Sequence, residues 1–278
     1  MNAPPISAQR FISQRVPRKE DGRLLIGRGS FVDDIILPGM LHAAFVRSPI
    51  ARGTIRSIDT DVARAQPGVH AVLTQADLAP FGVTMLSFFL GPVEVAMTPL
   101  ADGRVAYVGH PVALVIADDR YLAEDSASLV VVDYAEEAAV VTLDDARLGP
   151  RVHPDTDDNV AALMGEEDAD AALEALLAGA PHLVSQSIRH QRIAQSPMET
   201  RGVVASLQGE SDLLVHITCA GPQLVARWLT LALDRPGLSV RVIAKDVGGS
   251  FGLKNHPWME EVSAILAAML LRRPVKWI

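Results

Sequence analysis

The chain has 278 residues, 49% of them hydrophobic and 21% charged, with a formal net charge of −8 and one cysteine. This composition excludes a disordered chain, and the length predicts two domains, because a typical domain has about 100 to 200 residues. The weak negative charge and the 5% aromatic content argue against a nucleic-acid-binding protein, which needs a basic surface or stacking platforms.

The N-terminal half alternates β-rich runs with helical ones. Strands are predicted at 41–46, 54–58, 69–73, 111–117 and 129–134, with a helix at 118–128 that has Asp118 or Asp119 as its N-cap. The stretch 79–102 has no clear period and is predicted to be a long surface loop. This mixture indicates an α+β or α/β fold rather than a sandwich. Residues 1–20 lack the apolar core of a secretory signal.

An acidic segment at 151–180 marks the predicted domain boundary. It holds eight acidic residues and one basic residue, so most of the net charge lies there. The run from His153 to Asn159 is typical of an exposed connector, and 168–180 predicts a short helix that ends near Gly179. A metal site is the alternative, but the carboxylates lack the spacing and fixed glycine of a calcium loop.

The C-terminal segment, 181–278, also mixes strands and helices. Strands are predicted at 182–192, 202–207, 213–219, 238–244 and 275–278. A helix at 222–233 would bury Leu224, Val225, Trp228 and Leu231, and a helix at 257–271 would bury Val262, Ile265, Leu266, Met269 and Leu270. The longest uncharged apolar run, 262–271, is too short to span a bilayer, so we expect a cytoplasmic protein without a membrane span.

A glycine-rich motif lies between the predicted strand 238–244 and the helix that follows. Three glycines among five residues, Gly248, Gly249, Ser250, Phe251 and Gly252, allow a sharp turn and a close approach to a bound group. The spacing fits neither a dinucleotide fingerprint nor a P-loop. Composition alone favours a plain strand-to-helix turn, and free amides facing an oxyanion or a metal-oxo ligand are the functional alternative.

A second cluster of polar residues runs from His190 to Arg201. Glu199 has two interpretations: a general acid or base tuned by Arg201 or His190, or a structural ion pair at a strand end. The second is the more common arrangement. Other histidines, such as His42, His110 and His256, show no metal-ligand spacing.

Several separated motifs resemble the molybdenum-binding large subunit of the xanthine dehydrogenase and aldehyde oxidase family, with the carbon monoxide dehydrogenase-like branch nearest. In the C-terminal half they are HQRIAQSPMETRGVVA, VRVIAKDVGGSFGLK and RRPVKWI. In the N-terminal half, RLLIGRGSFVDDIILPGMLHAAFVRSPIARGTIRSID and RVAYVGHPVALVIADDRYLAEDSASLVVVDY resemble the family's α/β hammerhead domain. The order of the motifs agrees over nearly the whole chain.

The resemblance implies an α+β architecture in which residues 1–150 form the hammerhead domain and 151–180 the acidic linker and short helix. Residues 181–278 would then begin a mixed α/β molybdopterin-binding domain. It also implies a molybdenum hydroxylase, which inserts water-derived oxygen into a C–H bond of an aldehyde, an N-heterocycle or a similar small molecule, or oxidises carbon monoxide.

The implied cofactor is a molybdopterin cytosine dinucleotide, with residues 248–252 as its binding residues and Phe251 and Gly252 next to it. FAD and [2Fe-2S] clusters would lie on partner subunits, because the one cysteine, Cys219, cannot hold a cluster. No residue of this chain is assigned a catalytic or metal-ligating role.

Two departures from the family pattern are expected. Ala220 occupies the place of a glutamine beside the molybdenum centre, unless the alignment shifts to Gln223. Family members also continue well beyond the equivalent of Ile278, and that part carries the glutamate that acts as general base. The chain is therefore expected to assemble with the remainder of the large subunit or a second chain carrying it. The alternative is a catalytically incomplete fragment that acts as a folding or interaction scaffold.

Overall fold

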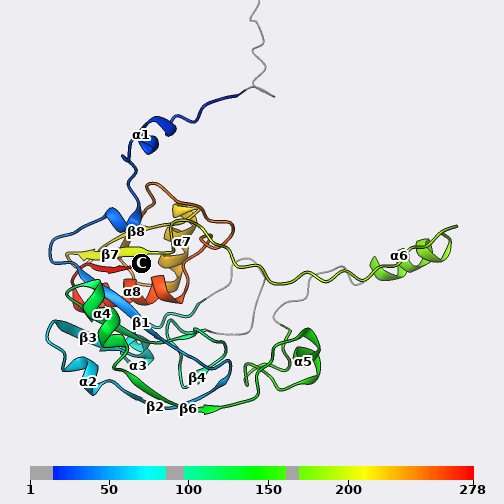
Figure 1. Cartoon of the computed structure of the whole chain (residues 1–278), viewed down its shortest axis with the longest axis horizontal. Helices are drawn as coiled ribbons and strands as arrows, with labels where there is room; N and C mark the ends of the chain where they lie inside the picture. The colour runs from blue at the N-terminus through cyan, green and yellow to red at the C-terminus, as the bar shows by residue number, and fades with distance from the viewer. Residues whose placement is uncertain (1–14, 86–96, 161–168) are drawn as a thin grey trace, which may run out of the picture.

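A seven-stranded mixed sheet combines strands from both halves of the chain. The computed structural model describes residues 15–85, 97–160 and 169–278. The strand order is β3-β5-β1-β10-β7-β8-β9. Figure 1 labels β1, β3, β7 and β8 of this sheet. The strands are β1 Leu41–Arg47, β3 Val69–Leu73, β5 Pro111–Ala117, β7 Val203–Gln208, β8 Asp212–Ile217, β9 Ser239–Ile243 and β10 Val275–Trp277. The mixed sheet and its helices confirm the α+β class.

The two halves meet where β1 pairs in parallel with β10. Leu41 lies opposite Val275, and the Leu41 amide donates to the Pro274 carbonyl at 2.8 Å. On its other edge β10 pairs antiparallel with β7. One sheet therefore contains strands from before and from after the acidic segment. The domain limits expected at 150 and 180 stay a prediction.

Helices cover both faces of this sheet. On one face lie α7 (Pro222–Leu233) and α8 (Met259–Leu271), whose apolar residues join those of β1, β5, β7 and β8 in the main core. On the other face α4 (Arg120–Ala127) packs on β1 and β5 through Ala123, Ala44 and Ala117. Because both faces are covered, all seven residues of β5 are buried.

A smaller antiparallel sheet, with the order β4-β2-β6, lies beside the main one. Its strands are β2 Gly53–Asp59, β4 Arg104–Val105 and β6 Val131–Glu136. Its apolar face buries Val105 and Ala101 against Val112 of β5. The remaining helices are short: α1 Asp21–Leu25, η1 Val32–Asp34, α2 Asp61–Arg64, α3 Gln75–Leu78, η2 Ala79–Phe81, α5 Leu143–Leu148 and α6 Ala169–Ala178.

Most predicted elements are confirmed within two or three residues. The Asp119 carboxylate caps α4 by accepting the Leu122 amide at 2.9 Å, which selects between the two expected caps. The predicted loop at 79–102 contains η2 and a bridge between Met85 and Met97, while 86–96 lie outside the described residues. Among the described residues, no helix is long and apolar enough to cross a membrane.

The predicted strand at 182–192 is wrong. This segment is exposed and has no strand partner among the described residues, so its alternating pattern lacks the pairing that defines a strand.

The buried face of α7 is also not the predicted one. Leu224 and Leu231 are 58% and 54% exposed, whereas Val225, Trp228, Leu229 and Leu233 are buried. These four buried residues form a second apolar stripe, which faces the sheet where α7 contacts β9. In α8 the predicted core residue Leu270 is 44% exposed, whereas its neighbours Met269 and Leu271 pack against the core, so Leu270 lies on the outer side of the helix.

Candidate functional site

The glycine motif forms an irregular turn between β9 and α8. Gly248 lies so close to Glu199 that a β-carbon on it would stand 2.4 Å from the Glu199 Cβ. Gly252 adopts φ +90°, which other residues rarely accept, and a β-carbon there would meet open space. We call residues 246–252 the glycine turn. One side of it is thus packed and the other is open.

The open side presents unused backbone donors. In the part of the chain that the structure describes, the amides of residues 249–252 donate no hydrogen bond, whereas the Gly248 amide donates to Glu199 Oε2 at 2.7 Å. Phe251 has φ +52°, an uncommon value for a non-glycine residue, and its side chain is 73% exposed. Successive amides left free in this way can receive an anionic or oxo ligand.

A buried ion pair holds the packed side of the turn. The Lys254 side chain is fully buried, and its Nζ donates to the Glu199 carbonyl at 2.8 Å, to Glu199 Oε2 at 3.1 Å and to Thr218 Oγ1 at 2.9 Å. Thr218 Oγ1 in turn donates to Glu199 Oε2 at 2.6 Å. Each charge has a full set of partners, as a stable buried pair requires.

An N-terminal segment holds the start of the turn. Arg23 forms a bidentate pair with Asp246, whose carboxylate also accepts the Ser30 amide at 2.7 Å. The bond from Arg23 and the bond from Ser30 lower the pKa of Asp246 to about 2. Because these partners are more than 200 residues apart, local sequence patterns do not reveal the contact.

Arg201 is the centre of a second buried network. Its guanidinium pairs with Glu260 at 2.7 Å and with Glu261 at 3.0 Å, and it lies 5.2 Å from the Trp277 ring centroid. Burial raises the pKa of Glu261 to about 7 in spite of Arg201, and the charge of Glu260 adds to this rise. Burial also opposes ionisation of Glu260, but Arg201 and Arg47 outweigh it and lower that pKa. The network fixes the start of α8 against β10.

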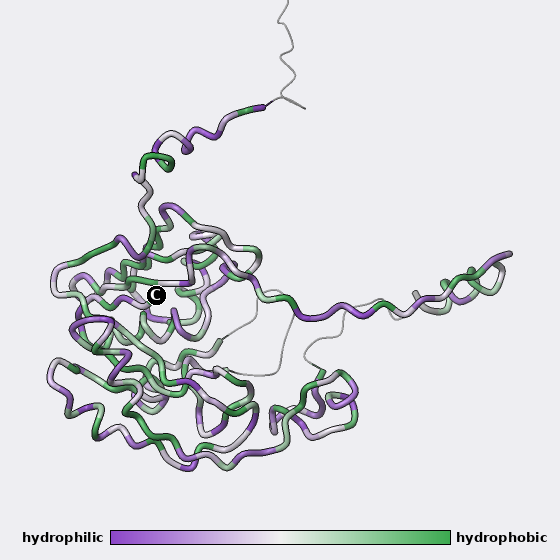
Figure 2. Tube along the Cα trace, viewed as in Figure 1, coloured by the Kyte–Doolittle hydropathy of each residue, from purple (hydrophilic) through white to green (hydrophobic). Residues whose placement is uncertain are grey.

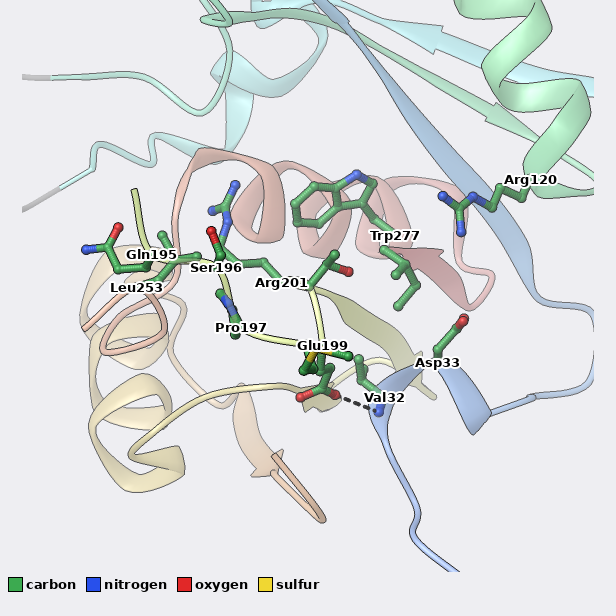
Figure 3. Close-up of a pocket in the computed structure, with 13 residues that line it drawn as sticks. Val32, Asp33, Arg120, Gln195, Ser196, Pro197, Glu199, Arg201, Leu253 and Trp277 are labelled. Atoms are coloured by element: carbon green, nitrogen blue, oxygen red, sulfur yellow. Dashed lines mark hydrogen bonds between the residues drawn. The ribbon is translucent and has the colours of Figure 1, made fainter. Parts of the chain in front are cut away.

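A cavity of about 640 Å³ lies beside the glycine turn (Figure 3). Its walls come from η1, α4, β10 and the segment before β7. The lining residues are Val32, Asp33, Arg120, Gln195, Ser196, Pro197, Met198, Glu199, Thr200, Arg201, Leu253, Trp277 and Ile278. The Glu199 side chain points toward η1, where Oε1 accepts the Val32 amide at 3.4 Å. Glu199 therefore links the cavity wall to the glycine turn.

The contacts of Glu199 favour its structural interpretation over the acid-base one. Its charged partner is Lys254 rather than Arg201 or His190, and the bonds to Thr218 and Gly248 occupy the carboxylate further. Sequence reasoning missed both Lys254 and Thr218. The only available signal was a lysine two residues after the last glycine of the motif, which by itself does not indicate burial.

Ala220 lies next to the turn, because its amide donates to the Lys254 carbonyl at 2.9 Å. Gln223 stands one residue into α7 and is exposed. In the described ranges, no group of three or more His, Cys, Asp or Glu side chains is placed to hold a metal. The expectation that the histidines are not metal ligands stays a prediction.

Comparison with known proteins divides the chain into two matches. Residues 26–138 match the family described as "Aldehyde oxidase and xanthine dehydrogenase, a/b hammerhead domain", and residues 152–278 match the "Molybdopterin cofactor-binding domain". The second match contains the glycine turn, Glu199 and Lys254.

The relatives are the large chain of a dehydrogenase and the large subunit of a hydroxylase. The carbon monoxide dehydrogenase large chain of Hydrogenophaga pseudoflava is 39% identical over 95% of this chain and 34% of its own length. The nicotine 6-hydroxylase large subunit of Paenarthrobacter nicotinovorans is 39% identical over 99% of this chain and 34% of its own length. The chain spans about a third of the length of these relatives.

Solved structures agree with the sequence matches. Quinoline 2-oxidoreductase from Pseudomonas putida 86 superposes with a TM-score of 0.83 at 34% identity, over 95% of this chain and 34% of that one. Fold, motif order and relatives lead to one assignment. The chain belongs to the xanthine dehydrogenase and aldehyde oxidase family and corresponds to about a third of its molybdenum-binding large subunit.

Proposed function

We propose that this chain forms part of the molybdopterin site of a molybdenum hydroxylase large subunit. The observation that carries the proposal is the glycine turn, which is fixed by Glu199 and Lys254 on one side and leaves the amides of residues 249–252 free on the other. Its position within the match to the molybdopterin cofactor-binding domain supports this assignment.

The residues present fit such a group. A molybdopterin presents oxo, sulfur and phosphate atoms that accept hydrogen bonds, and the turn offers successive donors with no side chain at Gly252 to obstruct them. We assign cofactor binding to Gly248, Gly249, Ser250, Phe251 and Gly252. Gly248 acts by allowing the turn to approach Glu199, and the next four act through their amides. The cytosine dinucleotide form of the cofactor is part of the proposal.

When bound, the molybdenum centre would supply insertion of water-derived oxygen into a substrate C–H bond, or oxidation of carbon monoxide. The chain's own residues hold the turn rigid: the Lys254 charge is paired within the protein, and Asp246 is held ionised by Arg23. Ala220, beside the turn, has only a methyl group, so it cannot hydrogen-bond to an oxo ligand as the expected glutamine would.

Electron transfer is proposed to take place on partners. The single cysteine, Cys219, is buried, and burial raises the pKa of its thiol. One cysteine cannot provide the four ligands of a [2Fe-2S] cluster. We therefore propose an iron-sulfur subunit, an FAD subunit and the remainder of the large subunit as partners, and an aldehyde, an N-heterocycle or carbon monoxide as substrate. The cytoplasmic location stays a prediction.

The proposal is tested in a full-length chimera, in which this chain replaces the matching third of the Hydrogenophaga pseudoflava large chain. We expect about one molybdenum and one pterin per chimera, measured by metal analysis and by fluorescence of the oxidised pterin, with cytidine monophosphate released on hydrolysis. A folded chimera without molybdenum would contradict the proposal and favour the scaffold alternative.

A matched pair of variants separates the site from general backbone strain. Gly252 and Gly237 both have positive φ, +90° and +82°, and both face open space, but only Gly252 lies in the glycine turn. Each Gly→Ala change costs about 1 kcal/mol of stability. We expect Gly252→Ala to lower cofactor content at least about tenfold, since a loss of about 1.4 kcal/mol in binding corresponds to that factor. Gly237→Ala should leave the content unchanged, and equal effects would count against the site.

A further inference from the structure

An extended segment leaves the body of the molecule between α6 and the cavity wall. We call residues 181–194 the arm (Figure 1). In an extended chain its four large apolar residues fall on both sides: Val184 and Ile188 on one, and Leu183 and Ile193 on the other. Figure 2 shows this run of hydrophobic and hydrophilic residues outside the body.

The arm is unpaired within the described part of the chain. No backbone hydrogen bond is formed by residues 181–198 there, until the Glu199 amide donates to the Gly248 carbonyl. Its four large apolar side chains are exposed: Leu183 63%, Val184 90%, Ile188 73% and Ile193 80%. An extended segment with free donors, free acceptors and exposed apolar residues has the properties of an added strand in β-augmentation.

We propose that the arm pairs as a β-strand with a strand of the same large subunit that lies outside this chain. The occupant follows from length: the relatives match this chain over 95–99% of its residues, yet these matches cover only 34% of their own length. In those relatives about two thirds of the chain lies outside the matched part, and a strand of the corresponding portion is the partner that we propose. Like the proposed function, the inference rests on the chain belonging to a larger subunit, but it does not require molybdenum.

The arm also determines where that strand would lie. Residues 195–201 follow the arm directly and line the cavity. Within this range, Glu199 accepts the Gly248 amide of the glycine turn. A strand paired with the arm thus stands at the edge of the cavity. The arm carries Arg189 and Arg192 and no acidic residue, so we expect the paired strand to be neutral or acidic. Pairing would bring the rest of the subunit over the cavity.

Proline substitution tests the pairing, because proline has no amide to donate and N–H groups of neighbouring residues in a strand point to opposite edges. Gln186→Pro and Ser187→Pro form a matched pair, since both residues are polar and exposed. In the isolated chain we expect no change of the thermal midpoint with either. In the chimera at least one should lower the midpoint, and only one if the arm is paired along a single edge.

Hydrogen exchange gives a second readout that needs no variant. We expect the arm amides to exchange at least about tenfold more slowly in the chimera than in the isolated chain, with β5 and α8 protected in both as a check of folding. Fast exchange of the arm amides in a folded chimera, together with an unchanged thermal midpoint in both proline variants, would overturn the proposal. Protection in the isolated chain that depends on concentration would also overturn it, in favour of pairing between two copies.

The two proposals fail separately. An arm that is protected in a chimera lacking molybdenum would support the pairing and contradict the cofactor site. A chimera that contains molybdenum but has an unprotected arm would support the cofactor site and contradict the pairing.

Discussion

At the scale of single residues, Glu199 and Lys254 are the main support of the candidate site. The Lys254 Nζ makes three bonds, and Glu199 Oε2 accepts from Lys254, Thr218 and Gly248. The Lys254 side chain is fully buried, and three of the hydrogen bonds to the Glu199 carboxylate converge on Oε2. These contacts favour a role in positioning the glycine turn.

Removing one member of the pair should be costly. Glu199→Gln leaves the buried Lys254 ammonium without its counter-charge, and we expect the free energy of unfolding in urea to fall by about 3 kcal/mol or more. Adding Lys254→Met should restore part of the loss. Glu210→Gln, which breaks the exposed pair with Arg272, is the control and should have a much smaller effect. Equal losses of unfolding free energy for Glu199→Gln and Glu210→Gln would show that the Glu199–Lys254 pair stabilises the fold no more than an exposed pair.

Glu261 predicts a dependence of stability on pH. Its pKa in the folded protein is about 7, above the ordinary 4.5, so between these values the folded state holds a proton that the unfolded chain releases. The stability from this group is present below about pH 4.5 and is lost as the pH rises through 7. Relative to wild type, Glu261→Gln should gain up to about 3 kcal/mol between pH 5 and pH 8 in urea unfolding. A constant difference across this range would contradict the assignment.

At the scale of elements, the sequence pattern identified the strands better than it identified helix faces. β-branched runs such as Pro111–Ala117 and Ser239–Ile243 predict strands that the structure contains. The pattern in α7 allowed two apolar stripes, and contact with β9 selected the one with Val225 and Leu229. The pattern of the arm predicts a strand, but the arm has no strand partner among the described residues, and the structure leaves it without regular secondary structure.

The two stripes of α7 should respond differently to truncation. Leu229→Ala empties a site that is 1% exposed, and the free energy of unfolding should fall by about 2 to 5 kcal/mol. Leu231→Ala, two positions along the same helix and 54% exposed, should change it by less than about 1 kcal/mol in the isolated chain. Chemical denaturation of both variants is the measurement. Similar losses would support the buried face of α7 that was predicted from the sequence.

At the scale of the whole molecule, the shared sheet connects the two family matches. The parallel pairing of β1 with β10 and the antiparallel pairing of β10 with β7 place strands of both matches side by side. Sequence patterns do not predict this, because the pairing of Leu41 with Val275 spans most of the chain. The same holds for the Arg23–Asp246 pair at the glycine turn, whereas the motif itself is visible in the sequence.

This architecture predicts one cooperative unfolding transition. The three tryptophans, Trp228, Trp258 and Trp277, all lie in the second match, so their fluorescence reports that part, while far-ultraviolet circular dichroism reports the whole chain. We expect the two probes to give coincident curves in urea. Two separated transitions would show that the matched segments unfold independently in spite of the shared sheet.

The most direct test of the central claim is amide hydrogen exchange at residues 249–252 in the full-length chimera, compared between cofactor-loaded protein and protein made without molybdopterin. If these free amides receive the cofactor, their exchange should slow by at least about tenfold on loading, while β5 stays equally protected in both samples. Unchanged exchange at the glycine turn in a chimera shown to contain molybdenum and pterin would contradict the claim.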